Sequence, residues 1–218
     1  VNETITAPDA SVLGRPNSYI GRSVPRPNAK RLMAGQGQFV DDIKLQRMVH
    51  VAFVRSPYAH ARITGIDTKE ASHSAGVIKV ITAKDLESYC SPWVGVLTHF
   101  KGLKSAPQYP LAVDHVCWQG EAVAAVVANS RAEAEDAVAL VEVTYDELPV
   151  VCEPETAADP STHVIHPELG DNIAFEYSVE AGDVESAFSN AALIVEENFL
   201  FERHTGVTLE PRVMLSDY

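Results

Sequence analysis

A segment in the middle of the sequence, residues 121–145, constrains the fold more than any other. A strand-like run spans Glu121–Ala128, and Ser130 and Glu133 follow it with the spacing of a helix capping box. Apolar residues then occur at positions 134, 137, 138 and 141, which lie on one face of a helix. Since Val143–Tyr145 has strand character again, the order is strand, helix, strand, and it predicts an α/β layer.

Further elements of both kinds are expected on either side of this segment. Asp67 with Glu70, and Thr82 with Asp85, have capping spacing and predict two short helices. Period-two alternation and β-branched residues predict further strands at 38–40, 48–54, 61–66, 76–81 and 113–118. The expected fold class is therefore α/β (α+β).

Proline and glycine divide the chain into four expected parts. Residues 1–34 contain four prolines and form an extended lead-in, and residues 35–151 hold the predicted α/β domain. Residues 152–182 are rich in proline, glycine and acids and form a connecting segment. Residues 183–218 begin another domain.

In this last part, Asp183 caps a predicted helix. A strand at Leu193–Arg203 and its hairpin partner at Val207–Leu215 are expected to follow.

Composition and charge exclude several partners. Lys and Arg number 17 against 30 Asp and Glu, a net charge of −13 that repels phosphate backbones, so nucleic acid is not expected as a partner. The longest strictly apolar run, Ala122–Ala128, is too short for a membrane span. The first residues lack the features of a secretion signal, which predicts a cytoplasmic protein. The spacing of Cys90, Cys117 and Cys152 suits neither disulfides nor a metal clip, so buried, reduced thiols are expected.

Three motifs that could carry chemistry favour structural roles instead. Gly35–Val40 begins like a dinucleotide loop, but it lacks the third glycine and precedes a strand, so a tight turn is expected. His163 and His166 lack a third metal ligand and are expected to be solvated. His60, at a strand start, is expected to be a hydrogen-bonded structural residue. No Gly-x-Ser-x-Gly motif supports a hydrolase.

Acidic residues also gather near the C-terminal end of the sequence, at positions 196, 197, 202 and 210. Paired carboxylates can perform acid–base catalysis, but alternation along a strand favours a solvated face for Glu196 and Glu202. Glu210 and Arg212 could form an internal ion pair of structural use. The residues alone therefore predict no self-contained catalytic set.

The longest irregular stretch within the predicted α/β domain is the 88–111 loop. It contains prolines and glycines but also the apolar and aromatic residues Trp93, Leu97, Phe100 and Tyr109. Long loops that carry large apolar side chains are frequently functional.

The order of motifs along the chain is more specific than any single motif. The motifs are Gly35–Ile43, Met48–His50, Val54–Ile63, Gly76–Asp85, Gly120–Ala128, Val143–Pro149 and Arg203–Arg212. Together they resemble the N-terminal α/β hammerhead region of the molybdopterin-binding large subunit in the xanthine dehydrogenase, aldehyde oxidase and carbon monoxide dehydrogenase family. The resemblance runs from about residue 21 to residue 218, so it implies a hammerhead domain at 35–151 and the first strands of a molybdopterin-binding domain at 183–218.

The resemblance implies a molybdenum hydroxylase, an oxidoreductase that hydroxylates an aldehyde, an N-heterocycle or carbon monoxide with oxygen from water. The sequence has no Gly-Gly pair, so the family's Gly-Gly-x-Phe-Gly cofactor loop has no counterpart here, and neither do its active-site glutamine and glutamate. No catalytic, cofactor-binding or metal-binding residue is therefore carried over. A separate chain is expected to hold molybdopterin and molybdenum, other subunits would carry 2Fe-2S clusters and FAD, and the isolated chain is expected to be inactive.

In the family, the loop that corresponds to residues 88–111 approaches the substrate funnel. The resemblance thus makes Trp93, Leu97, Phe100 and Tyr109 candidates to line the substrate channel, while packing against a partner subunit is the alternative. A non-catalytic interaction or assembly module that retains only the hammerhead domain is the alternative function.

Overall fold

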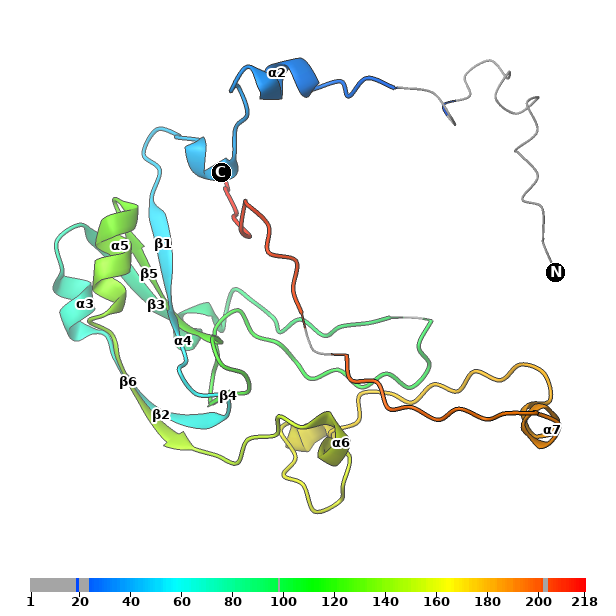
Figure 1. Ribbon diagram of the computed structural model, residues 1–218. Coiled ribbons are helices and arrows are strands. Elements are labelled where there is room, and N and C mark those ends of the chain that lie inside the picture. Colours follow the sequence, from blue (N-terminus) through cyan, green and yellow to red (C-terminus); the bar gives the residue numbers. More distant parts are fainter. Residues whose placement is uncertain (1–18, 20–23, 98, 202–203) are drawn as a thin grey trace. The chain divides into compact units, whose positions relative to one another are not determined.

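The computed structural model describes residues 19, 24–97, 99–201 and 204–218. These residues divide between two compact units, one made of the residues up to Leu45 together with Leu200–Tyr218, and the other of Gln46–Phe199. The second unit contains both β-sheets and most of the helices (Figure 1).

The first sheet of the Gln46–Phe199 unit has the strand order β1-β5-β3. Strands β1 (His50–Arg55) and β3 (Val77–Thr82) both pair antiparallel with β5 (Ala122–Ala128), which is the central strand. In this register Val54 is opposite Ala124, so small and branched apolar side chains meet across the sheet.

The second sheet has the strand order β4-β2-β6 and is also antiparallel. Its central strand β2 (Ala61–Asp67) pairs with β6 (Glu142–Glu147) over most of its length and with the short β4 (His115–Val116) at one end. The predicted strand, helix, strand segment therefore connects two different antiparallel sheets through its helix, rather than two strands of one sheet.

Three helices accompany these sheets: α3 (Lys69–His73), α4 (Ala83–Leu86) and α5 (Arg131–Val138). Helices α3 and α5 lie side by side against the first sheet (Figure 1). Ser130 is the N-cap of α5, as its spacing to Glu133 predicted, and its Oγ accepts a hydrogen bond from Glu133 N at 3.3 Å.

The core explains why β5 is apolar at every position. Its even-numbered residues Ala124 and Val126 pack with Ala137 of α5, whereas Val123 faces Ala61 and Val116 of the second sheet. Because successive side chains of a strand point to opposite faces, a strand buried on both faces has no polar side. The predicted helix face is confirmed at positions 134 and 137, which are buried, whereas the buried Val141 lies beyond the end of α5.

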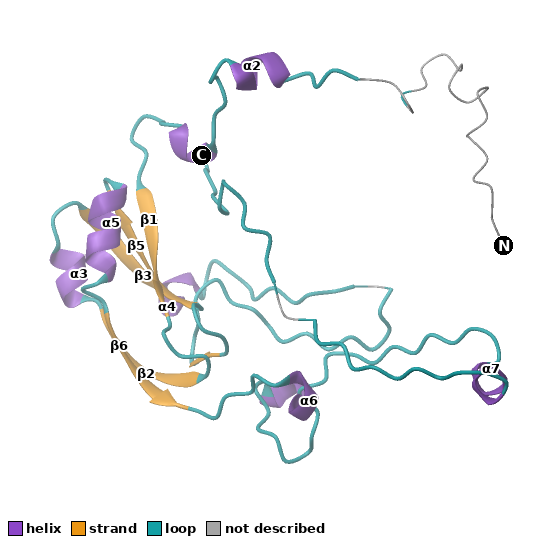
Figure 2. Cartoon of the chain, viewed as in Figure 1, coloured by secondary structure: helices purple, strands orange, loops and turns teal. Residues whose placement is uncertain are grey.

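After β6 the chain is mostly loop, with short helical turns at α6 (Pro154–Ala157), η2 (Pro167–Leu169) and α7 (Val184–Ser189) (Figure 2). Asp183 caps α7 as predicted, with its carboxylate accepting a hydrogen bond from Ser186 N at 2.9 Å. The predicted connecting segment, residues 152–182, thus contains the short helical turns α6 and η2.

The other unit contains α2 (Ala29–Met33) and the 3₁₀ helix η1 (Val40–Asp42). Most of the predicted lead-in at 1–34 lies outside the described residues, and α2 falls within its described part. Gly35, at φ +69°, directly follows the C-cap of α2, which agrees with the predicted tight turn. The Glu210 carboxylate accepts a hydrogen bond from Val40 N at 2.7 Å.

Several local predictions were wrong. Residues 38–40 form no strand and instead lead into η1, and the strand expected at 113–118 is reduced to two residues. The Asp67–Glu70 capping box does not form, because Thr68 is the N-cap of α3 and the Asp67 carboxylate accepts a hydrogen bond from Lys69 N.

The strand pair expected at 193–203 and 207–215 was also wrong, since no strand occurs in the described residues of these ranges. A strand needs a hydrogen-bonding neighbour and a face to bury. The described residues provide neither here, and Phe199 is 91% and Phe201 86% exposed. Glu202 and Arg203 lie outside the described residues.

Candidate functional site

The 88–111 loop leaves the fold after α4 and returns to the apolar positions Leu111 and Ala112, both of which are buried. Its two arms pair once near the base, where Trp93 and Gln108 exchange two backbone hydrogen bonds of 2.8 Å. Further out, Gly95 N donates a hydrogen bond to Ser105 Oγ at 3.0 Å. The loop is thus a hairpin-like excursion with a fixed base.

A cavity of about 700 Å³ lies at the base of this loop. Its walls come from α4, from the start of the loop and from its return arm, and include Leu86, Tyr89, Cys90, Tyr109, Pro110 and Leu111. Cavities of this size, lined by apolar and aromatic groups with a few polar ones, are typical of small-molecule sites.

The structure does not gather the four predicted channel residues into one pocket. Tyr109 lines the cavity. Trp93 pairs at the loop base with Gln108, the residue that precedes Tyr109. Leu97 is half exposed, and Phe100 packs with its ring centroid 4.6 Å from that of Phe175. The loop presents these side chains at different points along its length.

The sequence interpretation missed two groups that belong with this loop. Tyr89 and Cys90 share the cavity with Tyr109, and their place next to the predicted loop was a usable signal. Lys104 and Phe100 contact Asp171 and Phe175, about 70 positions further along the chain, and nothing in the sequence pattern indicated these pairs.

The histidine candidates have structural contacts. His60 is buried, with its Nδ1 2.8 Å from the Pro149 carbonyl oxygen, which agrees with its predicted structural role. The His163 ring packs against it with centroids 5.2 Å apart, while His166 Nδ1 lies 3.6 Å from the Glu168 carboxylate. Within residues 24–97, 99–201 and 204–218, no three His, Cys, Asp or Glu side chains converge as metal ligands.

The carboxylate candidates also stay apart. Glu196 is exposed, as expected for a solvated face, although the segment is not a strand, and Glu197 is exposed as well. The Glu210 carboxylate binds the backbone of Val40 instead of forming the predicted pair with Arg212.

Cys117 and Glu121 are neighbouring, partly buried groups whose pKa values are both raised. Cys117 N donates a hydrogen bond of 2.6 Å to the Glu121 carboxylate. Burial, with smaller contributions from the charges of Glu121 and Glu168, raises the pKa of the Cys117 thiol to about 11. Burial also raises the pKa of Glu121, against the backbone hydrogen bonds that stabilise its charged form. A thiol held protonated in this way is a poor nucleophile.

All three cysteines are free, as predicted, but the expectation that they are buried was wrong. Cys90 and Cys152 are exposed and Cys117 is half-buried. Cys90 lies at the start of the 88–111 loop, where the chain has left the cores of both sheets.

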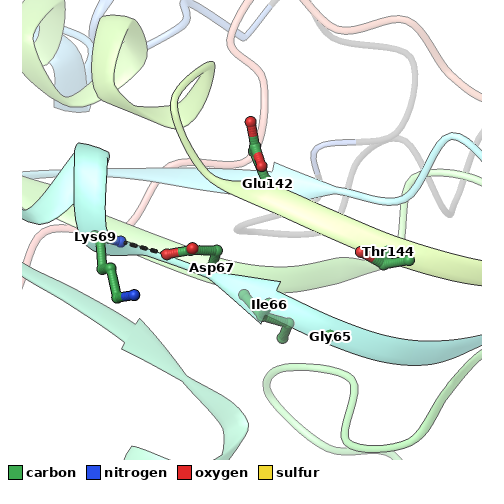
Figure 3. Close-up of a pocket in the computed structure, with 6 residues that line it drawn as sticks. All are labelled: Gly65, Ile66, Asp67, Lys69, Glu142 and Thr144. Atoms are coloured by element: carbon green, nitrogen blue, oxygen red, sulfur yellow. Dashed lines mark hydrogen bonds between the residues drawn. The ribbon is translucent and has the colours of Figure 1, made fainter.

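A second, smaller cavity of about 360 Å³ lies on β2 and β6 (Figure 3). It is lined by Gly65, Ile66, Asp67, Lys69, Glu142 and Thr144. The Asp67 carboxylate accepts a hydrogen bond from Lys69 N at 2.9 Å. The Glu142 side chain points away from Asp67 (Figure 3). Its polar groups do not converge, so the cavity at the loop base is the better candidate site.

Among the helices of the described residues, none has the length and apolar character needed to cross a membrane.

Comparisons with known proteins agree with this fold. A family model described as "Aldehyde oxidase and xanthine dehydrogenase, a/b hammerhead domain" matches residues 34–149. The nicotine 6-hydroxylase large subunit of Paenarthrobacter nicotinovorans is 40% identical over 203 residues, which cover 92% of this chain and 24% of that protein. The carbon monoxide dehydrogenase large chain of Afipia carboxidovorans is 35% identical over 186 residues, covering 79% of this chain and 22% of that protein.

A solved structure is similar over much of the same region. The crystal structure of quinoline 2-oxidoreductase from Pseudomonas putida 86 has a TM-score of 0.73 and 36% identity, covering 79% of this chain and 22% of that one. The chain spans about a quarter of the length of the curated relatives it matches. Since the family model covers more than half of the chain, the chain belongs to the aldehyde oxidase and xanthine dehydrogenase family of molybdenum hydroxylases, with an α/β hammerhead domain at residues 34–149.

Proposed function

We propose that this chain forms a scaffold and one wall of the substrate channel in a molybdenum hydroxylase, an oxidoreductase that hydroxylates its substrate with oxygen from water. The observation that carries the proposal is the hammerhead match together with 40% identity to a large subunit over 92% of the chain. The described residues supply a core of two sheets, and a long loop with exposed aromatic side chains extends from it.

The molybdenum cofactor is assigned to polypeptide other than the described residues. The described ranges do not fit a metal centre ligated by protein side chains, because no three potential ligand side chains converge there. No reaction step is therefore derived from this chain. In this proposal, molybdopterin with molybdenum is held by a separate chain that supplies the rest of the large subunit. Further subunits would carry 2Fe-2S clusters and FAD.

The proposed contribution of this chain is to select the substrate. Trp93, Leu97 and Tyr109 are each about half exposed or more, so their side chains are available to contact a substrate or a neighbouring subunit. Aromatic walls suit flat, apolar molecules. Among an aldehyde, an N-heterocycle and carbon monoxide, we favour the N-heterocycle, since two of the similar proteins are named for nicotine and quinoline.

A cytoplasmic location is part of the same proposal. It is supported by the three free cysteines, of which two are exposed, because a reducing compartment keeps such thiols from forming disulfides.

The first test asks what accompanies this chain when it is isolated gently from its source. Native mass spectrometry and metal analysis are expected to find molybdenum, iron and flavin in a complex with the rest of a large subunit. The isolated chain is expected to contain no molybdenum and to be inactive. Stoichiometric molybdenum in the isolated chain would contradict the assignment of the cofactor. A folded, metal-free chain with no such partner would favour the alternative, a non-catalytic assembly module.

The second test concerns the loop. In the assembled enzyme, Trp93→Ala and Phe100→Ala are each expected to change the ratio of kcat/KM for quinoline to kcat/KM for a small aldehyde by about tenfold. The reason is that the loss of an apolar contact weakens the binding of the larger substrate more than that of the smaller one. Val96→Ala, at an exposed position of the same loop, is the matched control and should leave the ratio unchanged. Unchanged preference in both aromatic variants would assign the loop to packing alone.

A further inference from the structure

The far part of the 88–111 loop is held by a segment that lies about 70 positions further along the chain. Lys104 Nζ forms an ion pair with the Asp171 carboxylate and lies 3.4 Å from the Leu169 carbonyl oxygen. The backbone of the same residue contributes a third contact, since Lys104 N donates a hydrogen bond of 2.8 Å to the Ala174 carbonyl oxygen. One loop residue thus contacts this segment at three positions.

Aromatic packing accompanies these polar contacts. The Phe100 ring lies 4.6 Å from the Phe175 ring, with 32° between their planes, and meets Tyr177 edge-on at 6.2 Å. Both distances fall in the range in which aromatic pairs attract each other. Phe100, one of the predicted channel residues, therefore packs against two aromatic residues of the second segment.

The supporting segment is itself fixed by Asn172. Its Nδ2 donates hydrogen bonds to the carbonyl oxygens of Ala157 at 3.0 Å and His163 at 2.9 Å, and its Oδ1 accepts one from Ile165 N at 3.0 Å. Three backbone groups from a single stretch are thus joined by one side chain. Asp171, the partner of Lys104, is held next to it, since its Oδ1 also accepts a hydrogen bond from Ile173 N at 2.9 Å.

The contacts continue from this stretch into the core. The ring of His163 packs on His60, which is 4% exposed and whose Nδ1 lies 2.8 Å from the Pro149 carbonyl oxygen. An unbroken series of contacts therefore joins Lys104, through Asp171 and Asn172, to the buried start of β2. A loop with glycines at 95 and 102 would sample many conformations without such support.

From this geometry we propose that Lys104, Asp171 and Asn172 are positioning residues that hold residues 93–97 and 99–108 of the loop in one conformation and thereby determine which substrates the aromatic side chains of the loop accept. The second half of this proposal, the selection of substrates, rests on the proposed function. The first half, the anchoring of the loop, concerns this chain alone. Each contact is weak when partly exposed, so the anchoring depends on several acting together.

The experiment compares four variants in the assembled enzyme. Lys104→Ala removes the ion pair, Lys104→Arg retains a cation, Asn172→Ala releases the supporting segment, and Lys101→Ala changes an exposed lysine of the same loop as the matched control. Hydrogen exchange of peptides covering residues 93–108 is measured by mass spectrometry, alongside kcat and KM for quinoline and a small aldehyde.

Lys104→Ala and Asn172→Ala are expected to speed exchange in the loop by up to about fivefold, the amount that weak surface contacts can contribute. They should raise KM for quinoline with little change in kcat, because the reacting groups lie elsewhere. Lys104→Arg should restore both values, and Lys101→Ala should resemble the unaltered enzyme.

Each outcome decides one part of the proposal. Exchange in Lys104→Ala and Asn172→Ala equal to that in Lys101→Ala would overturn the anchoring. Faster exchange with unchanged substrate preference would overturn the role in selection. Faster exchange in an assembly that hydroxylates none of the substrates would retain the anchoring and contradict the proposed function instead.

Discussion

The Glu133 carboxylate, in the first turn of α5, lies directly over the backbone of Gly76, so that a Cβ at position 76 would overlap it. Gly76 has φ +79°, a backbone conformation that favours glycine, and its carbonyl oxygen accepts a hydrogen bond from Asn129 N at 2.9 Å. The start of β3 and the start of α5 are thus brought together at a position where only glycine fits.

Gly76→Ala is therefore expected to lower the free energy of unfolding by about 2 kcal/mol. About half of this is the strain of placing alanine at positive φ, and the rest is the displacement of Glu133 from its 2.8 Å hydrogen bond with Ser130 Oγ. Gly102→Ala, at φ +80° with no neighbouring atom within 4 Å, should cost only about 1 kcal/mol. Urea unfolding measures both, and equal losses would contradict the role of Glu133.

The N-cap of α5 gives a second prediction. Ser130→Ala removes a side chain that accepts a hydrogen bond from Glu133 N, so it should destabilise the protein by about 1 kcal/mol. Thr68→Ala is the control, because Thr68 is the N-cap of α3 without a side-chain capping hydrogen bond, and it should cost less than about 0.5 kcal/mol. Thermal or urea unfolding would show this order, and a reversed order would contradict it.

Asp85 predicts a dependence of stability on pH. Hydrogen bonds from Thr82 N at 2.8 Å and Thr82 Oγ1 at 2.9 Å, together with the ion pair to Lys79, lower the pKa of Asp85 below its ordinary value of 3.8. A carboxyl whose pKa is lower in the folded state stabilises the fold above its ordinary pKa and stops doing so as pH falls through the lowered value.

Asp85→Asn is therefore expected to be less stable than the unaltered protein at pH 6, and the difference should shrink as pH drops below 3.8. Glu87→Gln, an exposed position next to the end of α4, is the control. Unfolding curves over this pH range test the prediction, and a difference that stays constant would be inconsistent with the hydrogen bonds to Thr82.

Cys117 should resist alkylation. Its pKa of about 11, against 9.0 for an ordinary thiol, leaves on the order of 100-fold less reactive thiolate at neutral pH. Iodoacetamide labelling followed by mass spectrometry should modify the exposed Cys90 and Cys152 first, and all three should react alike in urea. Labelling of Cys117 as fast as Cys90 in the folded protein would contradict the proposed burial of its thiol.

The local part of the fold was predictable from the sequence. The capping residues Ser130 and Asp183 were recognised because each contacts a residue three positions away. The Thr82–Asp85 pair follows the same rule. The central strand β5 and the buried face of α5 were recognised because their apolar spacing directly reflects burial.

Pairing between distant segments was not predictable in the same way. Residues 193–203 have apolar side chains at alternating positions, yet no strand forms in the described residues of this range. A strand also requires a neighbouring strand to pair with, which the segment itself does not specify. Likewise, β5 and β6 were expected in one layer and belong to two sheets, a choice made by which strands each one meets.

The candidate site divides along the same line. The sequence by itself determined the family resemblance, the α/β class and the presence of a long loop bearing Trp93, Phe100 and Tyr109. Only the tertiary structure decided that Tyr109 lines a cavity, and that Lys104 and Phe100 are held by residues about 70 positions away. The physical reason is that local patterns record the burial and turns of each segment, whereas contacts between loops depend on where the folded core brings them.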